Sequence, residues 1–587
     1  MTDSTATITP DTTPTVAGAV AVAETIRTVD ANGAVWLHTP PRPKPDGLDL
    51  TDLRGADRFS ASTTAMVRGA SPDYRRWLSH VHSAAGCSQP VRLAGMVRTT
   101  NVNTRTGEVT ETKTVTEDMP DGVIYKACGN RRASVCPSCS EIYRADAYQL
   151  VLAGMRGGKG VPETVSGHPA VFATATAPGF GVVHTTRTNK KSGKPEPCRA
   201  RRAPDLCPHG VDMRCMTSHA EGDERLGRPL CPDCYDYDHH AVWNTFAGEL
   251  WRYTTMKANR ELRKWARRHG YAERVEDPET GKVSSKVPVR ISFGKVAEFQ
   301  RRGLVHFHVL ARFDGIHPLD TDLVVPPPDW ANVFLLSWIL EQALAATAYR
   351  TPPHVVHDHD GRTLVDRPDG WLLRWGSQVD VRPVRLRGED KLSGERVVDE
   401  LDHSDATGGT GQLDKHGRRR LLSGPAVAGY LAKYATKATE AAGHTSRKIT
   451  DETVDFYAND THPGRLIEAC WRLSQKGDQS AQEWRDSKYY ALRRWAHMLG
   501  YGGHFFSKSR RYSTTFKRLR QARVDYRRAH HESAEHLEEN EVLESVGELV
   551  FAGSGWHTTG DAMLANTAAA MARERRQVGR LEIATSG

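Results

Sequence analysis

The positions of its cysteines constrain the fold of this chain more than any other feature of the sequence. Ten cysteines in 587 residues are too few for a disulfide scaffold. Seven of them nevertheless fall into two sets, and each set contains a Cys-x7-Cys pair and a Cys-Pro-x-Cys knuckle. The sets are Cys207, Cys215, Cys231 and Cys234, and Cys128, Cys136 and Cys139.

This spacing predicts bound zinc. A Cys-x-x-Cys pair can close on one ion, and a second pair completes a tetrahedron of thiolates. We expect one structural Zn²⁺ on each set, with Cys87 as the fourth ligand of the second set. Cys198 and His209 are spare ligand candidates, and Cys470 lies in a helical pattern that suits a core thiol. The alternative for both sets is a group of reduced thiols that bind no metal.

Charge and hydropathy narrow the class of protein. Lys and Arg total 80 against 71 Asp and Glu, which gives a net charge of +9. The mean hydropathy of −0.55 excludes a membrane protein, and no stretch approaches the length of about 18 apolar residues that spans a bilayer. The N-terminal sequence lacks the basic start of a secretory signal. We therefore expect a cytoplasmic protein, in which thiols stay reduced and clustered cysteines hold metal.

A pair of alternating segments predicts a β-hairpin that carries a second type of metal site. Residues 287–299 and 304–313 alternate in polarity around a short break that contains glycine. His306 and His308 are two residues apart and so project from the same face of a strand. Glu298, just before the turn, is placed to become a third ligand. Two imidazoles and a carboxylate leave positions open for Mg²⁺ or Mn²⁺ and a substrate oxygen. The alternative is two unrelated histidines on a polar strand face.

The segment 424–443 predicts a helix with two tyrosines on one face. Tyr430 and Tyr434 are four residues apart, and so are Lys433 and Lys437. A tyrosine hydroxyl can attack a phosphodiester if a metal polarises the phosphate and a cation steadies the charge. The alternative is an amphipathic helix with buried tyrosines and solvated lysines.

Two basic segments with interleaved aromatic residues indicate contact with nucleic acid. Residues 251–270 hold seven Lys or Arg against one acidic residue, and residues 508–528 hold nine against one. Such segments suit phosphate contacts and base stacking, although a solvated helix face has the same composition. The candidate DNA-binding residues are Arg260, Lys264, Arg267, Arg268, Lys508, Arg510 and Arg511. The sequence has no GxxxxGK[ST] motif, so we expect no ATPase or helicase activity of its own.

Taken in order, these motifs resemble the HUH endonucleases, and specifically the rolling-circle replication initiators. The strand motif FATATAP (172–178) comes first, the pair His306 and His308 second, and the tyrosine helix last. Conjugative relaxases of the same superfamily usually carry the tyrosine ahead of the histidines. Phrases such as EFQRRGLVHFH and GYLAKYATK are similar to the RepSA-like initiators of actinobacterial plasmids and integrative conjugative elements. The resemblance covers roughly residues 75–530.

The resemblance implies a role for each residue of the tyrosine helix. KYATK is similar to the KYxxK of single-tyrosine initiators, which makes Tyr434 the primary nucleophile. Those initiators carry a glutamate four residues earlier that activates water, and here Tyr430 stands in its place. Either Tyr430 or a water would then take part in the closing step. Lys433 or Lys437 would stabilise the phosphate charge or position the metal.

From these observations we expect an α+β fold, an HUH-type domain with a central antiparallel sheet and flanking helices. The expected segments are a disordered leader (1–70), an N-terminal zinc module (71–160), the endonuclease domain (161–445) with a zinc-ribbon-like insertion (185–240), a helical basic DNA-binding region (446–530) and an acidic, flexible tail (531–587). The expected activity is origin-specific nicking and joining of DNA through a 5′-phosphotyrosine. Its partners would be the double-strand origin, the nicked single strand, and a host helicase and polymerase. An HUH transposase and a non-catalytic zinc-containing nucleic-acid-binding protein remain alternatives.

Overall fold

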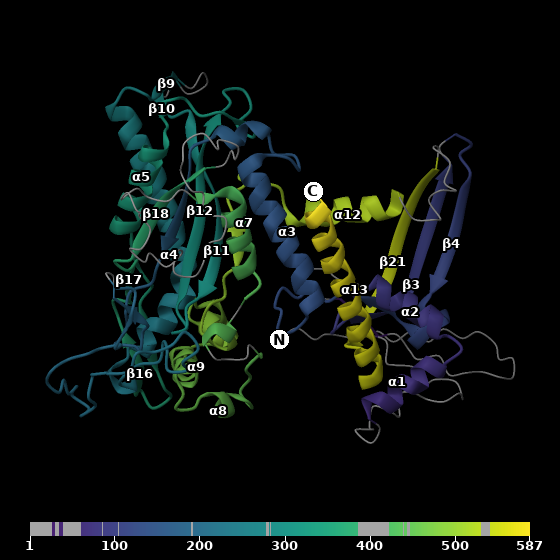
Figure 1. The fold of residues 1–587 in the computed structure, drawn as a ribbon, viewed down its shortest axis with the longest axis horizontal. Helices are drawn as coiled ribbons and strands as arrows, with labels where there is room; N and C mark the ends of the chain where they lie inside the picture. Colours follow the sequence, from purple (N-terminus) through teal and green to yellow (C-terminus); the bar gives the residue numbers. More distant parts are fainter. Residues whose placement is uncertain are drawn as a thin grey trace. The chain divides into compact units, whose positions relative to one another are not determined.

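The computed structural model describes a mixed α+β protein with antiparallel sheets (Figure 1). The described residues are 26–29, 35–38, 60–84, 86–103, 105–189, 192–276, 281, 283–385, 422–437, 439–442, 447–529 and 541–586. The chain divides into two compact units. The first comprises Met1–Cys128 with Leu537–Gly587, and the second comprises Gly129–His536. Among the described helices, none combines the length and the apolar composition needed to cross a membrane.

The first unit joins both ends of the chain in one sheet. Its strands are β3 (Val91–Asn103), β4 (Val109–Val115), β5 (Ile124–Lys126) and β21 (Glu541–Ser554), in the order β21-β3-β4 with β5 also paired to β3. Its helices are α1 (Ala61–Ala70), α2 (Tyr74–Ser83) and α13 (Thr559–Ser586). A separate hairpin comprises β1 (Ile26–Val29) and β2 (Val35–His38).

The expectation of a flexible tail at 531–587 is wrong for residues 541–586. β21 pairs antiparallel with β3 from Glu541 opposite Asn103 to Ser554 opposite Val91, and α13 follows it. Arg68 of α1 then forms buried ion pairs at 2.7 Å with both Asp121 and Asp561. The end of the expected leader, residues 61–70, is therefore part of this folded unit. Most of the remaining leader lies outside the described residues, as do residues 531–540.

A central antiparallel sheet organises the second unit. Its strand order is β19-β18-β6-β12-β11-β20, and β13 pairs with the end of β12. The strands are β6 (Ala170–Ala175), β11 (Val289–Phe299), β12 (Val305–Ile316), β13 (Val324–Val325), β18 (Val379–Arg385), β19 (Leu422–Ser423) and β20 (Phe506–Lys508). All neighbours are antiparallel except β18 and β19. Since β20 pairs with β11, the region expected as a separate DNA-binding segment (446–530) contributes a strand to this sheet.

Small antiparallel pairs and helices complete the second unit. The pairs are β7 (Arg187–Thr188) with β8 (Pro195–Glu196), β9 (Glu273–Glu276) with β10 (Val283–Lys286), β14 (Ala348–Arg350) with β17 (Leu372–Arg374), and β15 (His354–His357) with β16 (Thr363–Arg367). The helices are α3 (Pro137–Arg156), α4 (Tyr237–Arg268), α5 (Val333–Ala346), α7 (Gly424–Tyr434), α8 (Val454–Tyr457), α9 (His462–Leu473), α10 (Ala481–Asp486), α11 (Tyr490–Arg494) and α12 (Phe516–Ala529).

Helices cover both faces of the central sheet. In Figure 1, α4 and α5 lie on one side of β11 and β12, and α3 and α7 lie on the other. All of β12 except its last residue is buried, as is usual for a strand covered on both faces. Val305, Phe307 and Val309 point into the core beneath α4 and α5, and the alternate residues point toward α3 and α7.

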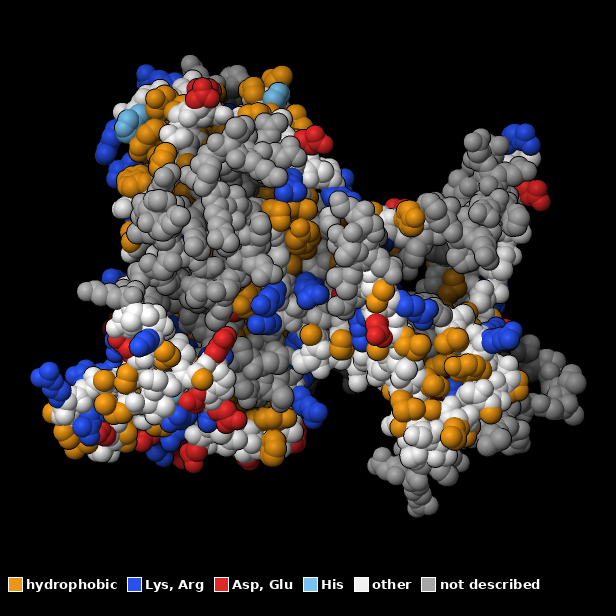
Figure 2. All heavy atoms as spheres, in the orientation of Figure 1, with side chains coloured by type: hydrophobic (Ala, Val, Ile, Leu, Met, Phe, Trp, Pro, Cys, Tyr) orange, Lys and Arg blue, Asp and Glu red, His pale blue; other side chains and the backbone are white. Residues whose placement is uncertain are grey.

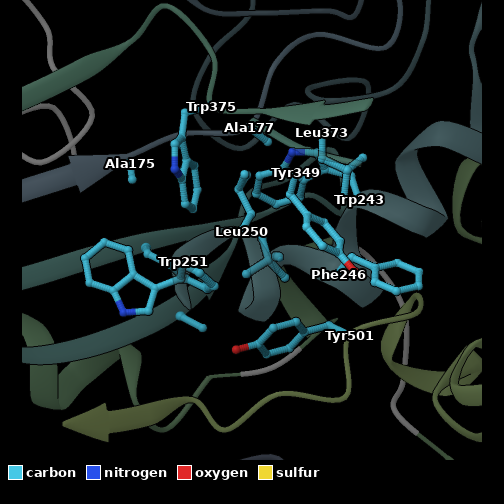
Figure 3. Close-up of a cluster of buried hydrophobic side chains, with 14 of the residues drawn as sticks. Ala175, Ala177, Trp243, Phe246, Leu250, Trp251, Tyr349, Leu373, Trp375 and Tyr501 are labelled. Carbon is cyan, nitrogen blue, oxygen red and sulfur yellow. The ribbon is translucent and has the colours of Figure 1, made fainter. Parts of the chain in front are cut away.

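The helix α4 anchors the larger core. Asp236 caps its first turn by accepting a hydrogen bond from the His239 amide, and apolar residues then recur at helical spacing. Figure 3 shows Trp243, Phe246, Leu250 and Trp251 of this helix meeting residues from the sheet and from the segments that follow it, among them Trp375 and Tyr501. Burial of such large side chains contributes roughly 2–3 kcal/mol each before entropy is counted. This core fixes the strands that carry the histidine pair.

Candidate metal centre and tyrosine helix

The predicted hairpin is confirmed. β11 and β12 pair in continuous register from Val289 opposite Gly315 to Phe299 opposite Val305. Gly303, at φ +80°, supplies the left-handed residue of the turn that joins them. This register places Glu298 directly opposite His306, and His308 lies two residues further along the same face.

The three predicted ligands converge on one point. The Oε2 atom of Glu298 lies 3.0 Å from Nε2 of His306 and 3.0 Å from Nε2 of His308. The two Nε2 atoms are 2.8 Å apart. All three side chains are buried, so little water competes for these atoms. A cluster of this kind can hold a metal ion.

Neighbouring residues fix the orientation of His308. The Thr174 hydroxyl on β6 lies 3.2 Å from Nδ1, and the ring of Phe172 is stacked on the imidazole with centroids 5.7 Å apart. A partner on Nδ1 leaves Nε2 directed at the cluster, which is how ligand histidines are usually held. Both residues belong to the strand motif 172–178, and β6 pairs with β12 as its neighbour.

Glu298 is an ionised carboxylate in this setting. Burial by itself raises the pKa of Glu298, but hydrogen bonds and charge interactions with His306 and His308 outweigh it and hold the pKa well below its usual range. The cluster therefore presents a negative charge flanked by two imidazoles. That donor set suits a divalent cation.

Both tyrosines of the predicted helix face this cluster. The Tyr430 hydroxyl lies 3.1 Å from Nε2 of His308, and the rings of Tyr430 and Tyr434 have centroids 4.5 Å apart. The Tyr434 ring centroid lies 6.3 Å from that of His308. Burial, the charge of Glu298 and the neighbouring Tyr434 raise the pKa of Tyr430 far above its ordinary value. Tyr430 is therefore a neutral phenol here.

The lysines lie beside Tyr434. The Nζ atoms of Lys433 and Lys437 are 5.7 Å and 4.5 Å from the centroid of its ring. Both residues are exposed at the surface while Tyr434 is buried. Partial burial and the like charge of Lys433 lower the pKa of Lys437. Cations at these positions can meet a phosphate that approaches Tyr434 from solvent.

The helix is shorter than the expected segment 424–443. α7 ends at Tyr434, and a short 3-10 turn follows at Thr439–Ala442. Arg131 binds the carbonyl groups of Ala435 and Lys437 just beyond the helix end, and its guanidinium lies 3.4 Å from the centroid of the Phe505 ring. A cation satisfies free carbonyl groups at a helix C-terminus, so Arg131 fixes the position of the Tyr434 end. Sequence reasoning missed this residue because nothing near it in the sequence marks it.

The first cysteine set does not form a single site. The structure groups Cys207, Cys231 and Cys234 with His209, which had been only a spare candidate. The prediction that Cys215 shares a site with these cysteines is wrong. Cys215 lies instead with Cys198 and two histidines, His184 and His219. The cause is backbone pairing, in which Arg199 and Cys215 form a β-bridge that draws Cys215 away from Cys207. The spacing Cys215-x3-His219 was the sequence signal that could have found the second group.

The second cysteine set is divided between the two units. In the first unit, the amide of Cys128 donates a hydrogen bond to Sγ of Cys87 at 3.3 Å. In the second unit, Cys136 is the residue immediately before α3 and Cys139 lies in the first turn of that helix. A zinc site that uses all four residues stays a prediction. Cys470 is fully buried in the larger core, as expected.

The two basic segments differ in how their charges are used. Arg260, Lys264, Arg267 and Arg268 are exposed along α4. Arg510 and Arg511 form ion pairs with Asp322, and Nζ of Lys508 donates to the backbone carbonyl of Arg510. In Figure 2, Lys and Arg side chains of the described surface lie among Asp and Glu. The α4 residues are therefore the more available candidates for phosphate contacts, and a role in DNA binding stays a prediction.

Comparison with known proteins identifies the family. The family model RepSA, described as "Replication initiator protein, pSAM2", matches residues 73–570. The chain belongs to the RepSA family. A "Replication initiator protein" of Streptomyces ambofaciens is 38% identical over 521 residues, which cover 88% of this chain and 94% of the relative. No solved structure matches this RepSA family member. The match includes the histidine pair, the tyrosine helix and the segment 184–234.

Proposed function

We propose that this replication initiator is an HUH-type, metal-dependent DNA endonuclease and strand transferase that starts rolling-circle replication. The observation that carries the proposal is the convergence of Glu298, His306 and His308, with the Tyr430 hydroxyl 3.1 Å from one ligand nitrogen. A histidine pair on a strand beside a tyrosine helix has the parts that phosphodiester transfer to tyrosine requires.

The donor set fits a six-coordinate divalent ion. Cis ligands of an octahedron lie about 3 Å apart when each metal–ligand bond is about 2.1 Å. The three ligand atoms here are separated by 2.8, 3.0 and 3.0 Å. Three protein ligands on one face would leave the other positions open, as in sites that bind a substrate oxygen. Glu298, His306 and His308 would hold Mg²⁺ or Mn²⁺, whose chemistry is to polarise a phosphate oxygen and stabilise its developing charge.

Tyr434 is the nucleophile of the proposed strand transfer. The Tyr434 oxygen forms a bond to phosphorus as the bond from phosphorus to the 3′ oxygen breaks. The phenol gives up its proton, and the departing 3′ oxygen takes one up. One phosphodiester replaces another, so no external energy is needed. The released 3′-OH can then prime a polymerase, which makes a host polymerase and helicase the expected partners.

The second tyrosine offers a way to end the cycle. Tyr430 occupies the position at which single-tyrosine initiators carry a glutamate, and its hydroxyl lies 3.1 Å from Nε2 of His308. Tyr430 can attack the phosphodiester at the regenerated junction. The 3′ oxygen released there can attack the Tyr434 phosphotyrosine, which frees the Tyr434 phenol and joins the strand without an activated water. Lys433 and Lys437 would pair with the phosphate charge during both transfers.

The test is a nicking assay on supercoiled plasmid that carries the DNA flanking this gene. We expect the full chain with Mg²⁺ or Mn²⁺ to nick one strand and to remain joined to a 5′ phosphate. His306→Ala should abolish nicking, Tyr434→Phe should abolish the covalent adduct, and Tyr430→Phe should allow the first transfer. Tyr490→Phe and His359→Ala, which lie outside the cluster, serve as matched controls.

Two results would count against the proposal in different ways. Full adduct formation by Tyr434→Phe together with its loss in Tyr430→Phe would move the nucleophile to Tyr430. Absence of nicking by the wild-type chain on DNA that it binds would overturn the endonuclease itself.

A further inference from the structure

The segment 184–234 contains eight metal-ligating side chains that the proposed nicking reaction does not use. They form two groups of four, and within each group all ligand atoms lie within 4.8 Å of one another. The groups are His184, Cys198, Cys215 and His219, and Cys207, His209, Cys231 and Cys234. We infer that this segment binds two structural zinc ions in a cross-braced arrangement, and that the group with His184 and His219 is a site beyond those predicted from the cysteine spacing.

The cross-brace follows from the order of the ligands. Along the chain they occur as four successive pairs, 184 with 198, 207 with 209, 215 with 219, and 231 with 234. The first and third pairs meet in one group, and the second and fourth pairs meet in the other. Along the chain, each site therefore has one ligand pair of the other site between its own two pairs. Binding of one ion would constrain the loop that carries ligands of the other ion.

The His219 group has the features of a built metal site. Nε2 of His219 lies 3.3 Å from Sγ of Cys215 and 3.1 Å from Nδ1 of His184. Its other ring nitrogen, Nδ1, lies 2.6 Å from Oδ2 of Asp223. A carboxylate on the far nitrogen fixes the tautomer that directs Nε2 at a metal, and metal-bound histidines almost always donate their other N–H to a carboxylate, a carbonyl or water. Cys198, Cys215 and His219 are buried.

Backbone pairing brings this group together. The amide of Arg199 donates to the Cys215 carbonyl, and the amide of Cys215 donates back to Arg199. His184 exchanges two backbone hydrogen bonds with residues 227 and 228, which return after the Cys215–His219 turn. The amide of Thr185 also donates to Sγ of Cys198 at 3.2 Å, a bond that favours a thiolate.

The Cys231 group is formed by two tight turns. Cys207 and His209 lie in one turn, which closes when the Gly210 amide donates to the Cys207 carbonyl at 2.9 Å. Cys231 immediately precedes a 3-10 turn at Pro232–Cys234, and Cys234 is the last residue of that turn. Nδ1 of His209 lies 3.2 Å from Sγ of Cys234 and 3.7 Å from Sγ of Cys231. Three thiolates and one imidazole are a common zinc ligand set.

The segment has little else to hold it in this shape. Its regular structure within the described residues consists of β7 and β8, two residues each, and the 3-10 turn. Short loops of this kind rarely bury enough apolar surface to fold alone, and bound zinc replaces the missing core. Convergence of eight soft or imidazole ligands in such a segment points to two ions.

The cross-braced segment also contacts the hairpin of the metal centre. Gly227, at φ +83°, packs so closely on the turn after β11 that a Cβ atom there would lie 2.6 Å from the Arg302 amide nitrogen. Asp233, inside the Cys231 knuckle, pairs with Arg465 of α9 at 2.6 Å. The two ions would therefore stabilise the turn that precedes His306 as well as their own loops.

Zinc content of the full-length chain tests the inference without reference to nicking. We expect His219→Ala and Cys198→Ser each to lose about one zinc per chain relative to wild type, or about two if the interlocked site is lost with it. His219→Cys should retain the wild-type content, because a thiolate can replace the imidazole. His359→Ala, an exposed histidine outside every group, is the matched control and should also retain it.

The result that would overturn the inference is equally specific. A single site built from Cys207, Cys215, Cys231 and Cys234 leaves His219 and Cys198 without a role. Wild-type zinc content in both His219→Ala and Cys198→Ser would therefore exclude the cross-brace. Cobalt substitution provides a second readout, because His219→Cys should increase the thiolate-to-cobalt absorption if His219 is a ligand.

Discussion

The centre at Glu298, His306 and His308 and the segment 184–234 both gather metal ligands, but they do so on opposite kinds of scaffold. The ligands of the centre stand on two paired strands whose register is continuous over the whole hairpin. Those of the segment stand on turns and on two-residue strands. The centre has three ligands from a buried sheet, and the segment has two sets of four.

This difference separates preorganised sites from sites that an ion must organise. Backbone hydrogen bonds and the packing of α4 and α7 hold the centre in place, so it would exchange the proposed ion without losing its shape. In the segment 184–234 the candidate ligands are themselves most of what would hold the loops together, so with the proposed zinc ions metal binding and folding would be one process there. The four experiments below test this contrast.

The largest effect should follow removal of the exchangeable ion. Brief treatment with EDTA should reduce nicking by at least about 1000-fold, equivalent to about 4 kcal/mol in the activation barrier, because the phosphate charge is no longer stabilised. Added Mg²⁺ or Mn²⁺ should restore activity, while the melting temperature and the tightly bound zinc stay unchanged. A large fall in melting temperature with zinc retained would show that the centre is not preorganised.

Substitution of a candidate ligand in the segment 184–234 should lower the stability of the protein, in contrast to removal of the ion from the centre. Cys231→Ser should destabilise the second unit by about 2–3 kcal/mol and expose residues 184–234 to proteolysis, because the fourth pair of ligands is broken. His306→Ala is the matched comparison and should leave residues 184–234 resistant to proteolysis, because His306 stands on the central sheet and not on that segment. If thermal denaturation and proteolysis do not distinguish the two variants, the contrast fails.

A buried lysine on the central sheet should make the stability of the protein depend on pH. Lys295 lies on β11, three residues before Glu298, and its Nζ is 3.5 Å from the centroid of the Phe307 ring. Burial lowers the pKa of Lys295 from 10.5 to about 7. The unfolded chain therefore binds more protons between these values, and stability should rise with pH by up to about 1.4 kcal/mol per unit.

Lys295→Met should remove that slope and leave the protein at least as stable at neutral pH. Denaturant unfolding at intervals from pH 7 to pH 10 measures it. Lys286→Met, on β10, is a control for loss of a lysine charge. An unchanged slope in Lys295→Met would mean that Lys295 is not the source of the pH dependence.

The smallest expected effect is a loss of stability at acid pH caused by His462, which contacts the turn between β11 and β12. His462 of α9 lies 2.9 Å from the Arg302 carbonyl through Nε2, and Tyr237 contacts its other nitrogen. Burial lowers the pKa of His462 from 6.5 to about 4. The unfolded state binds the proton more tightly, so stability should fall as pH drops below 6.5, by about 1–3 kcal/mol at pH 4.

His462→Gln keeps an N–H donor for Arg302 and should flatten this acid limb. The free energy of unfolding between pH 4 and pH 7 is the measurement, with the exposed residue substituted in His359→Ala as the control. An acid limb in His462→Gln as steep as that of the wild type would contradict this role for His462.

Local sequence patterns were sufficient to predict the centre formed by Glu298, His306 and His308. Alternation over 287–299 and 304–313 predicted the hairpin, and the two-residue spacing of His306 and His308 placed them on one face. The position of Glu298 before the turn then determined its register partner. The helix α4 is also locally encoded, because it begins one residue after its Asp236 cap and its apolar residues recur at helical spacing. In each case the interacting residues are near neighbours in the sequence, so short-range geometry decides the outcome.

Elements whose ends or pairing depend on residues far away in the sequence could not be predicted from local patterns. The strands β17 and β18 are separated by Gly376, which approaches Ala177 too closely for a side chain. The end of α7 at Tyr434 depends on Arg131, which lies far away in the sequence. β21 looked like part of an acidic tail, since its partner β3 is near the other end of the chain.

The sequence by itself determined which residues could bind metal and which could carry a phosphoryl group. It determined the histidine pair, its carboxylate, the two tyrosines and the supply of cysteines, because residue chemistry and short spacing do not depend on the fold. Only the tertiary structure decided which ligands belong together. Cys215 pairs with His219 and Cys198 instead of Cys207 because a backbone bridge to Arg199 directs it there, and such a bridge forms only when the whole segment closes.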